Sequence, residues 1–304
     1  MAKLSDKRLW IVTGKGGVGK SAVSAALAVL SARSGRRTLV CEVNTEDRLG
    51  PLLGTPPVGP QISSLEKNVW AVNVQPRDAM REYALMTLKL ESIYNAVFEN
   101  RLVRTFLRFI PSLQELVMLG KILHHLEEPL PEGGFKYQTI VLDAPATGHA
   151  ISFLSVPRVL LQTVPPGRLS QEAQHMRQLL EDSALSAVIL VALPEEMPVN
   201  ETLELATALR EKAHLQTILA VLNAYVPPRF SAADLLALSV APSLRELAED
   251  HLEQAATSAF FQKRLEQGLE VPLALVPRLA RSPLGRAGVE EIAAALQSSV
   301  GPAP

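Results

Sequence analysis

A short stretch near the start of the chain carries the residue types best suited to chemistry. Residues 14–21 read GKGGVGKS, and Gly14, Gly19, Lys20 and Ser21 fit the pattern G-x-x-x-x-G-K-[ST]. Glycines let successive backbone N–H groups turn toward one point, where they bind phosphate oxygens. The lysine of such a loop binds the terminal phosphates, and the serine hydroxyl is a ligand for Mg²⁺. The stretch therefore predicts a site for a nucleoside triphosphate with Mg²⁺.

The neighbouring residues supply the structural context that this pattern needs. The apolar run 9–14 precedes the loop and predicts a strand, while residues 21–33 follow with helical periodicity. The positive end of the helix dipole would then add to the attraction for phosphate. A chance match in an ordinary glycine-rich turn lacks this strand and helix, so the phosphate loop is favoured.

Lys15 is a second lysine, directly after the first glycine of the loop. In this it resembles the deviant Walker A loops of a class of dimeric ATPases. In that class the residue reaches across a two-fold interface to the partner's nucleotide, where it neutralises transition-state charge as an arginine finger does. The resemblance implies a dimer, against the simpler interpretation of a solvated loop lysine.

A second stretch, at 139–154, ends an apolar strand in Asp143 and continues as A-P-A-T-G-H. Asp143 stands where a Walker B carboxylate holds the water shell of Mg²⁺. The string Asp143–His149 closely resembles the D-T-A-P-T-G-H switch II motif of the ArsA-type anion-transporting ATPases. That family includes the arsenite-pump ATPase and the guided-entry ATPase that delivers tail-anchored membrane proteins.

The resemblance extends over nearly the whole chain. Segments similar to the family's other motifs are found at 73–83, 110–122, 191–210, 219–225 and 275–285. By position, the resemblance implies ATP contacts for Gly14, Gly16, Gly17, Val18, Gly19, Lys20, Ser21 and Ala22, with Asn223, Pro277 and Arg278 at the base. It implies catalytic positions at Lys15, Lys20, Asn44 and Asp143, a metal site at Ser21 and Asp143, and a switch at Thr147, Gly148 and His149.

The loop after the second strand departs from the family. In the family this loop resembles D-x-D-P-A-H-x-L, and the second Asp of that motif positions the attacking water. Alignment on Leu49 places Asn44 at the position of that Asp. An amide can orient water through its carbonyl but cannot accept a proton as a carboxylate does. The nearby acids Glu42, Glu46 and Asp47 are either substitutes or ordinary solvated loop residues. Two functions stay open: an ATP-hydrolysing homodimer, or a catalytically impaired regulatory subunit that pairs with an active paralogue in a heterodimer.

Cysteine content limits the metal chemistry. Cys41 is the single cysteine, so the chain has none of the CxxC pairs that share zinc across the dimer in targeting relatives. An arsenite site needs clustered thiolates, because soft metalloids bind sulfur. Arsenite transport is therefore disfavoured, the expected cofactors are ATP and Mg²⁺, and Cys41 is expected to pack as a small apolar residue in a buried strand.

The elements around these motifs predict a doubly wound α/β fold. Strands are expected at 9–14, 37–43, 69–74, 138–144, 187–193, 217–223 and 271–276. They are nearly continuous in Val, Ile and Leu, which is typical of parallel strands covered on both faces. Helices are expected at 21–33, 171–183, 200–213 and 287–298. We expect one P-loop ATPase domain, 1–304, with helical insertions at about 77–128 and 231–267 lying together beside the sheet.

Net charge and apolar content limit the classes of partner that we expect for this chain. The formal net charge is −1, which argues against nucleic-acid binding. No signal-peptide h-region and no apolar run of about 18 residues appears, so a cytoplasmic location is expected. A positioning ATPase of the ParA and MinD type stays a third alternative, although residues 288–304 are acidic and short rather than a basic membrane-binding helix. Peripheral membrane contact stays open.

The insertion at 77–128 suggests a client site. In targeting relatives a comparable region forms a hydrophobic groove for a client's membrane helix, and methionines such as Met80 and Met86 suit an adaptable groove. The alternative is an ordinary packed helical subdomain. The leading hypothesis is therefore a dimeric ATP-dependent switch that holds or releases a protein client or regulator.

Overall fold

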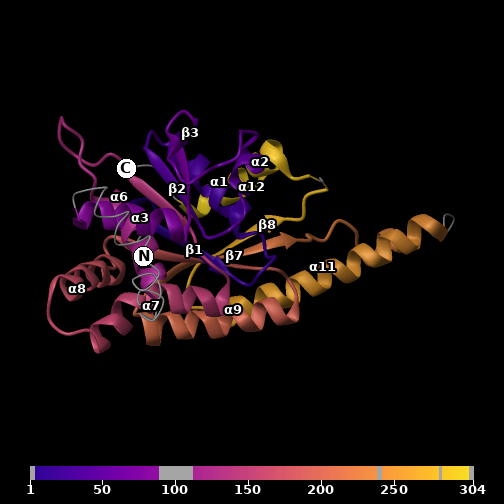
Figure 1. Cartoon of the computed structure of the whole chain (residues 1–304). Coiled ribbons are helices and arrows are strands. Elements are labelled where there is room, and N and C mark those ends of the chain that lie inside the picture. Colours follow the sequence, from indigo (N-terminus) through magenta and orange to yellow (C-terminus); the bar gives the residue numbers. More distant parts are fainter. Residues whose placement is uncertain (1–3, 89–111, 238–241, 281–282, 301–304) are drawn as a thin grey trace.

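The computed structural model describes residues 4–88, 112–237, 242–280 and 283–300 of the 304-residue chain. Within these residues the centre of the molecule is one sheet of eight strands (Figure 1). Its strands are β1 (Leu9–Gly14), β2 (Thr38–Val43), β3 (Ser63–Glu66), β4 (Val69–Val74), β5 (Thr139–Asp143), β6 (Ser186–Ala192), β7 (Thr217–Tyr225) and β8 (Leu273–Pro277). The spatial order is β3-β4-β2-β5-β1-β6-β7-β8, and every neighbouring pair is parallel except β3–β4.

The seven strands expected from the sequence are confirmed, with ends that differ by at most two residues. The expected list lacks β3, which reads SSLE and is partly exposed at the sheet edge. An edge strand of this kind has no continuous apolar run, because only part of its surface is buried. Since the carboxyl ends of parallel strands meet at one edge, the loops after β1, β2, β5, β6, β7 and β8 lie together there.

Helices cover both faces of the sheet (Figure 1). One face carries α1 (Lys20–Arg33), α2 (Leu49–Leu53) and α12 (Gly285–Val300). The other carries α3 (Pro76–Leu88), α6 (Leu113–Glu127), α7 (Thr147–Thr163), α8 (Arg168–Glu181), α9 (Glu196–Ala208) and α11 (Pro242–Gly268). Shorter helical segments are η1 (Leu4–Asp6), the π-helix η2 (Leu209–Ala213) and α10 (Ala232–Ala237). This is the doubly wound arrangement of a P-loop NTPase, as predicted.

The two helical blocks do not lie together in the described residues. Helices α3 and α6 pack on each other, and α6 also contacts α7 and α8, whereas α11 packs against α9 and β7 (Figure 1). The expectation that both blocks sit side by side is therefore wrong for this part of the chain, because each block packs locally beside the strands that flank it. Residues 89–111, the central part of the insertion in which the client groove is predicted, lie outside the described residues.

Alternation along the strands places two acidic side chains beside the first helix. Val40 and Val141 belong to the core cluster that includes α1, while Cys41 and Leu142 belong to the opposite one. Because side chains alternate between faces, Glu42 and Asp143 lie on the α1 face at the carboxyl ends of β2 and β5. No helix in the described ranges is long and apolar enough to span a membrane.

Candidate nucleotide-binding site

The glycine-rich loop connects β1 to α1, and close packing explains two of its glycines. At Gly14 an added Cβ would lie 2.2 Å from the backbone oxygen of Val191, and at Gly19 it would lie 2.3 Å from Nδ2 of Asn223. Gly17 and Gly19 also have φ values of 87° and 92°, in the left-handed region that favours glycine. The loop is thus held against β6 and β7 while its amides remain at the carboxyl edge of the sheet.

The two lysines of the loop have different partners. The Lys20 ammonium lies over the loop and donates a hydrogen bond to the Lys15 carbonyl oxygen, 2.9 Å away. Burial lowers the pKa of Lys20, and the nearby Asp143 carboxylate opposes that shift. Lys15 instead points to α9, where its Nζ lies 2.6 Å from Oε1 of Glu201. Lys20 is therefore placed for a phosphate bound in the loop, and Lys15 is held beside it.

Asp143 joins the end of β5 to the first turns of α1. Its Oδ2 accepts a hydrogen bond from the Ser21 hydroxyl at 2.6 Å, and its Oδ1 accepts one from Ser24 at 3.3 Å. Burial raises the pKa of Asp143, while the two hydroxyl donors and Lys20 oppose the rise. A serine hydroxyl and a carboxylate next to a phosphate loop are hard oxygen donors, the kind that Mg²⁺ prefers. These residues fit a magnesium site.

A further carboxyl group, Glu42, is fully buried beside Asp143. Its Oε1 accepts the Arg48 backbone N–H at 3.0 Å, but its Oε2 is buried without a hydrogen-bond partner. Burial raises the pKa of Glu42 to about 7, and the Asp143 and Asp47 carboxylates add to the rise. Asn44, two residues along, is exposed with a φ of 47°, and its backbone N–H donates to the Val74 carbonyl.

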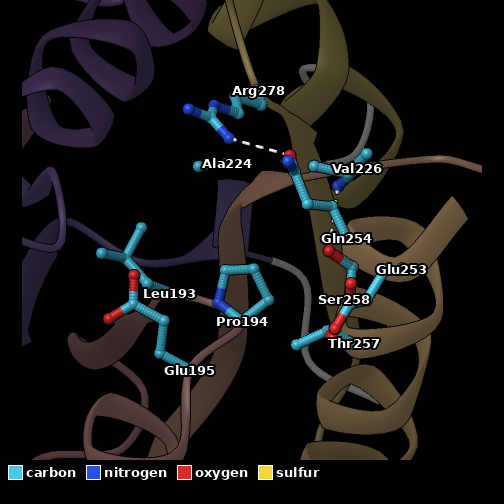
Figure 2. A pocket seen from close by; sticks show the side chains of 10 residues that line it. All are labelled: Leu193, Pro194, Glu195, Ala224, Val226, Glu253, Gln254, Thr257, Ser258 and Arg278. Carbon is cyan, nitrogen blue, oxygen red and sulfur yellow. Dashed lines mark hydrogen bonds between the residues drawn. The ribbon is translucent and has the colours of Figure 1, made fainter. Parts of the chain in front are cut away.

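A cavity of about 490 Å³ lies beyond the loop, at the carboxyl ends of β6, β7 and β8 (Figure 2). Its volume lies within the usual range for small-molecule sites. It is lined by Leu193, Pro194, Glu195, Ala224, Val226, Glu253, Gln254, Thr257, Ser258 and Arg278. The Arg278 guanidinium donates to Oε1 of Gln254 at 3.1 Å across its upper side. Asn223 does not line the cavity, and its amide donates to the Val18 carbonyl at 2.8 Å.

Comparison with known proteins agrees with this geometry. The family model described as "Anion-transporting ATPase" matches residues 7–166, which include the phosphate loop, Asp143 and the start of α7. The chain belongs to the anion-transporting ATPase family. It is 31% identical to ATPase BagA of Mycobacterium tuberculosis over 247 residues, or 77% of this chain and 70% of that protein. It is also 30% identical to ATPase ASNA1 homolog 1 of Paramecium tetraurelia over 156 residues, or 50% of this chain and 44% of that protein.

Membership confirms the resemblance found in the sequence and identifies an ATP-binding ATPase of this family. The family in general uses a nucleotide with Mg²⁺, which agrees with the donor set around Ser21. The segment predicted from the sequence to be a switch opens α7, where Thr147 is partly exposed and Gly148 and His149 are exposed. Helix α7 contacts α6, α8 and α9.

Several residues around the site were not assigned a role from the sequence. Glu201 lies within the family-like segment 191–210, but nothing in its spacing identifies it as the partner of Lys15. Ser24 follows Ser21 by nearly one helical turn, a spacing that could have indicated a second hydroxyl facing Asp143. Gln254, Thr257 and Ser258 come from α11, far along the chain, so only the fold brings them to the cavity.

Proposed function

We propose that this family member is a dimeric molecular switch that binds ATP with Mg²⁺ and acts on a protein client or regulator. The observation that carries the proposal is the 2.6 Å hydrogen bond between Ser21 and Asp143 beside the glycine-rich loop. It couples the first turn of the helix after the loop to the end of β5, four residues before the switch motif at Thr147. A ligand that changes this contact can therefore act on α7.

The proposed nucleotide contacts divide between two regions of the sheet edge. The triphosphate is bound by the amides of residues 14–22 and by the Lys20 ammonium, while the base occupies the cavity near Pro277 and Arg278. Asn223 links the two regions, because its side chain contacts the loop and its neighbour Ala224 lines the cavity. The Ser21 hydroxyl would bind Mg²⁺, and Asp143 would hold a water of its shell. The metal supplies positive charge to the phosphates when bound.

Lys15 supports a dimer in which each chain completes the site of the other. Its ammonium is only partly buried, and Glu201 holds it at the rim of the loop within the same chain. Extension toward a partner requires this ion pair to open. In the proposed closed dimer Lys15 stabilises the charge of the partner's phosphates, as an arginine finger does.

The exposed Asn44 favours a second candidate function. An amide cannot accept the proton of an attacking water, so a chain that depends on Asn44 would bind ATP but hydrolyse it poorly. Such a chain would be a regulatory subunit that pairs with a paralogue carrying the carboxylate. Turnover of the purified chain, alone and with such a paralogue, separates the two candidates, because only the regulatory subunit needs its partner for hydrolysis.

The test of the switch compares Lys15→Ala with the wild type by sedimentation velocity, with and without MgATP. We expect the wild type to dimerise with MgATP, and Lys15→Ala to bind ATP with nearly wild-type affinity yet stay monomeric. Lys212→Ala, an exposed lysine on η2, is the matched control and should dimerise normally. A Lys15→Ala variant that dimerises as the wild type does would contradict the proposed role of Lys15.

A further inference from the structure

We propose that Glu42 is a second carboxylate of the magnesium site, where it holds a water of the metal's shell beside Asp143. By this assignment Glu42, and not Asn44, supplies the negative charge that the loop after β2 otherwise lacks. The inference rests on the proposed binding of ATP with Mg²⁺ and adds a residue to that site.

The register of the sheet puts the two carboxyl groups side by side. Glu42 and Asp143 are direct partners on the neighbouring parallel strands β2 and β5, which lie about 4.8 Å apart in such sheets. Both side chains point to the α1 face, where Asp143 contacts Ser21 and Ser24. Glu42 is therefore far along the chain from Asp143 but lies next to it in the fold, beside the residues that fit a magnesium ion.

One oxygen of Glu42 has no hydrogen-bond partner, although the backbone amides of both Arg48 and Leu49 lie close to the carboxyl group. Oε2 is inaccessible to solvent and has no hydrogen-bond partner, which is costly for a carboxyl group in a protein interior. The bonded oxygen, Oε1, anchors the Arg48 amide at the start of α2. A glutamine would provide the same acceptor without the cost of burying a charge. The anchoring role alone does not explain a glutamate, whereas a water bound to a cation would satisfy Oε2.

The charges that face Glu42 also favour a cation. Asp143 and Asp47 are acidic, while Lys20 and Arg48 are the basic groups near this pair. Lys20 is directed to the Lys15 carbonyl at the phosphate loop, and the side chain of Arg48 is exposed. Two adjacent buried carboxyl groups disfavour each other's charged form, and a divalent cation removes that penalty. Asn44 is a poorer candidate, since it is exposed and cannot carry a negative charge.

The experiment measures how much Mg²⁺ strengthens ATP binding. Calorimetry gives the dissociation constant for ATP in excess Mg²⁺ and in EDTA, for the wild type and for Glu42→Gln. We expect Glu42→Gln to lose about tenfold or more of the gain from Mg²⁺, as changes to residues behind metal ligands commonly do. Its affinity for ATP in EDTA should equal or exceed that of the wild type, because a negative charge near the phosphates is gone.

Controls and a second variant keep the result unambiguous. Glu46→Gln changes a neighbouring, exposed loop carboxylate and should keep the wild-type gain. Glu42→Asp keeps the charge on a shorter side chain and should fall between the wild type and Glu42→Gln. Thermal unfolding establishes that each variant is folded. Should Glu42→Gln fail to fold, Glu42→Asp alone tests the inference. We expect it to lose about threefold or more of the gain in ATP affinity from Mg²⁺.

Two outcomes separate this inference from the function on which it rests. Wild-type protein that binds ATP, together with a Glu42→Gln variant that keeps the full gain from Mg²⁺, would overturn the role of Glu42 and leave the switch intact. A Glu42→Asp variant no better than Glu42→Gln would also overturn it, because the carboxylate would then not matter. Wild-type protein that binds no ATP would instead overturn the proposed function.

Discussion

Gly19 shows how one residue can serve both the fold and the proposed ligand site. It ends the phosphate loop with a φ of 92°, and Asn223 occupies the space where a Cβ would lie. Asn223 in turn holds the Val18 carbonyl, which keeps the loop against β7. A side chain at Gly19 would therefore disturb the loop and the edge of the cavity together.

Gly19→Ala is expected to destabilise the protein by about 1–3 kcal/mol, because it adds backbone strain and displaces Asn223. Gly16→Ala is the matched control within the same loop, since Gly16 has no positive φ and nothing lies within 4 Å of an added Cβ. It should change stability by less than about 0.5 kcal/mol. Urea unfolding measures both, and equal stability of the two variants would refute the packing argument.

Cys41 tests the prediction that the single cysteine belongs to the core. Its side chain is fully buried in β2, and burial raises the pKa of the thiol to about 12. Because the thiolate is the reactive form, the folded protein should not react with iodoacetamide at mildly alkaline pH, while the urea-unfolded chain should react completely. Mass spectrometry reads the adduct, and rapid labelling of folded protein would show that β2 is not packed as described.

At the residue scale, the sequence predicted the phosphate loop and Asp143 because their motifs are local. Each lies within a run of eight residues or fewer, so spacing alone identifies it. Glu42 was named only as a nearby acid that could substitute for the missing Asp, and the positions of Glu42 beside Asp143 and of Glu201 beside Lys15 were not predicted. Glu42 and Glu201 reach the site through strand register and helix packing, and neither relation leaves a fixed spacing in the sequence.

At the scale of elements, the strands were predicted well because buried parallel strands are continuous apolar runs. Helices α7 and α2 were not expected as helices. Helix α7 begins with the switch motif and contains Pro157, and both features usually mark a loop or a helix end. Helix α2 is only five residues long, too short to show a periodic pattern.

Helix α9 holds Lys15 through Glu201, so the proposed dimerisation with MgATP should respond to a change on this helix. Glu201→Gln removes the ion pair and should favour the MgATP dimer, because Lys15 no longer has to leave a charged partner. Each chain of the dimer has one such partly exposed ion pair, which contributes on the order of 0.5 kcal/mol. Loss of the pair in both chains therefore predicts a dimer about fivefold tighter. Sedimentation equilibrium measures the constant.

Glu204→Gln provides the control for this prediction on the same helix. Glu204 is exposed one turn away on α9, and its change should leave the dimer constant unaltered. A Glu201→Gln dimer as weak as or weaker than the wild-type dimer would show that the ion pair does not restrain Lys15.

At the scale of the whole molecule, the cavity proposed for the base is assembled from three strand ends and α11. Residues as distant as Leu193 and Arg278 line one space (Figure 2), and Asn223, the neighbour of the lining residue Ala224, contacts the loop after β1. This follows from the strand order, which places β6, β7 and β8 in succession beside β1. A ligand that fills both the cavity and the loop after β1 would contact most of the carboxyl edge formed by β1, β6, β7 and β8.

Two ligands, one with a base and one without, should therefore distinguish binding in the cavity from binding at the loop. Arg278→Ala is expected to weaken ATP binding by about tenfold, which corresponds to about 1.4 kcal/mol, while inorganic tripolyphosphate binding stays unchanged. Arg210→Ala, an exposed arginine on η2 that does not line the cavity, should affect neither ligand. Competition calorimetry provides both constants, and an equal loss for the two ligands would place the base elsewhere.

Calorimetric titration of MgATP into the wild type and into Lys20→Ala tests whether the glycine-rich loop binds the triphosphate. We expect one site per chain in the wild type, and an affinity at least about tenfold weaker in Lys20→Ala, since the ammonium proposed to bind the phosphates is lost. Thermal unfolding should show the variant folded. Wild-type protein that gives no binding heat, or a Lys20→Ala variant that binds as tightly as the wild type, would contradict binding at the loop.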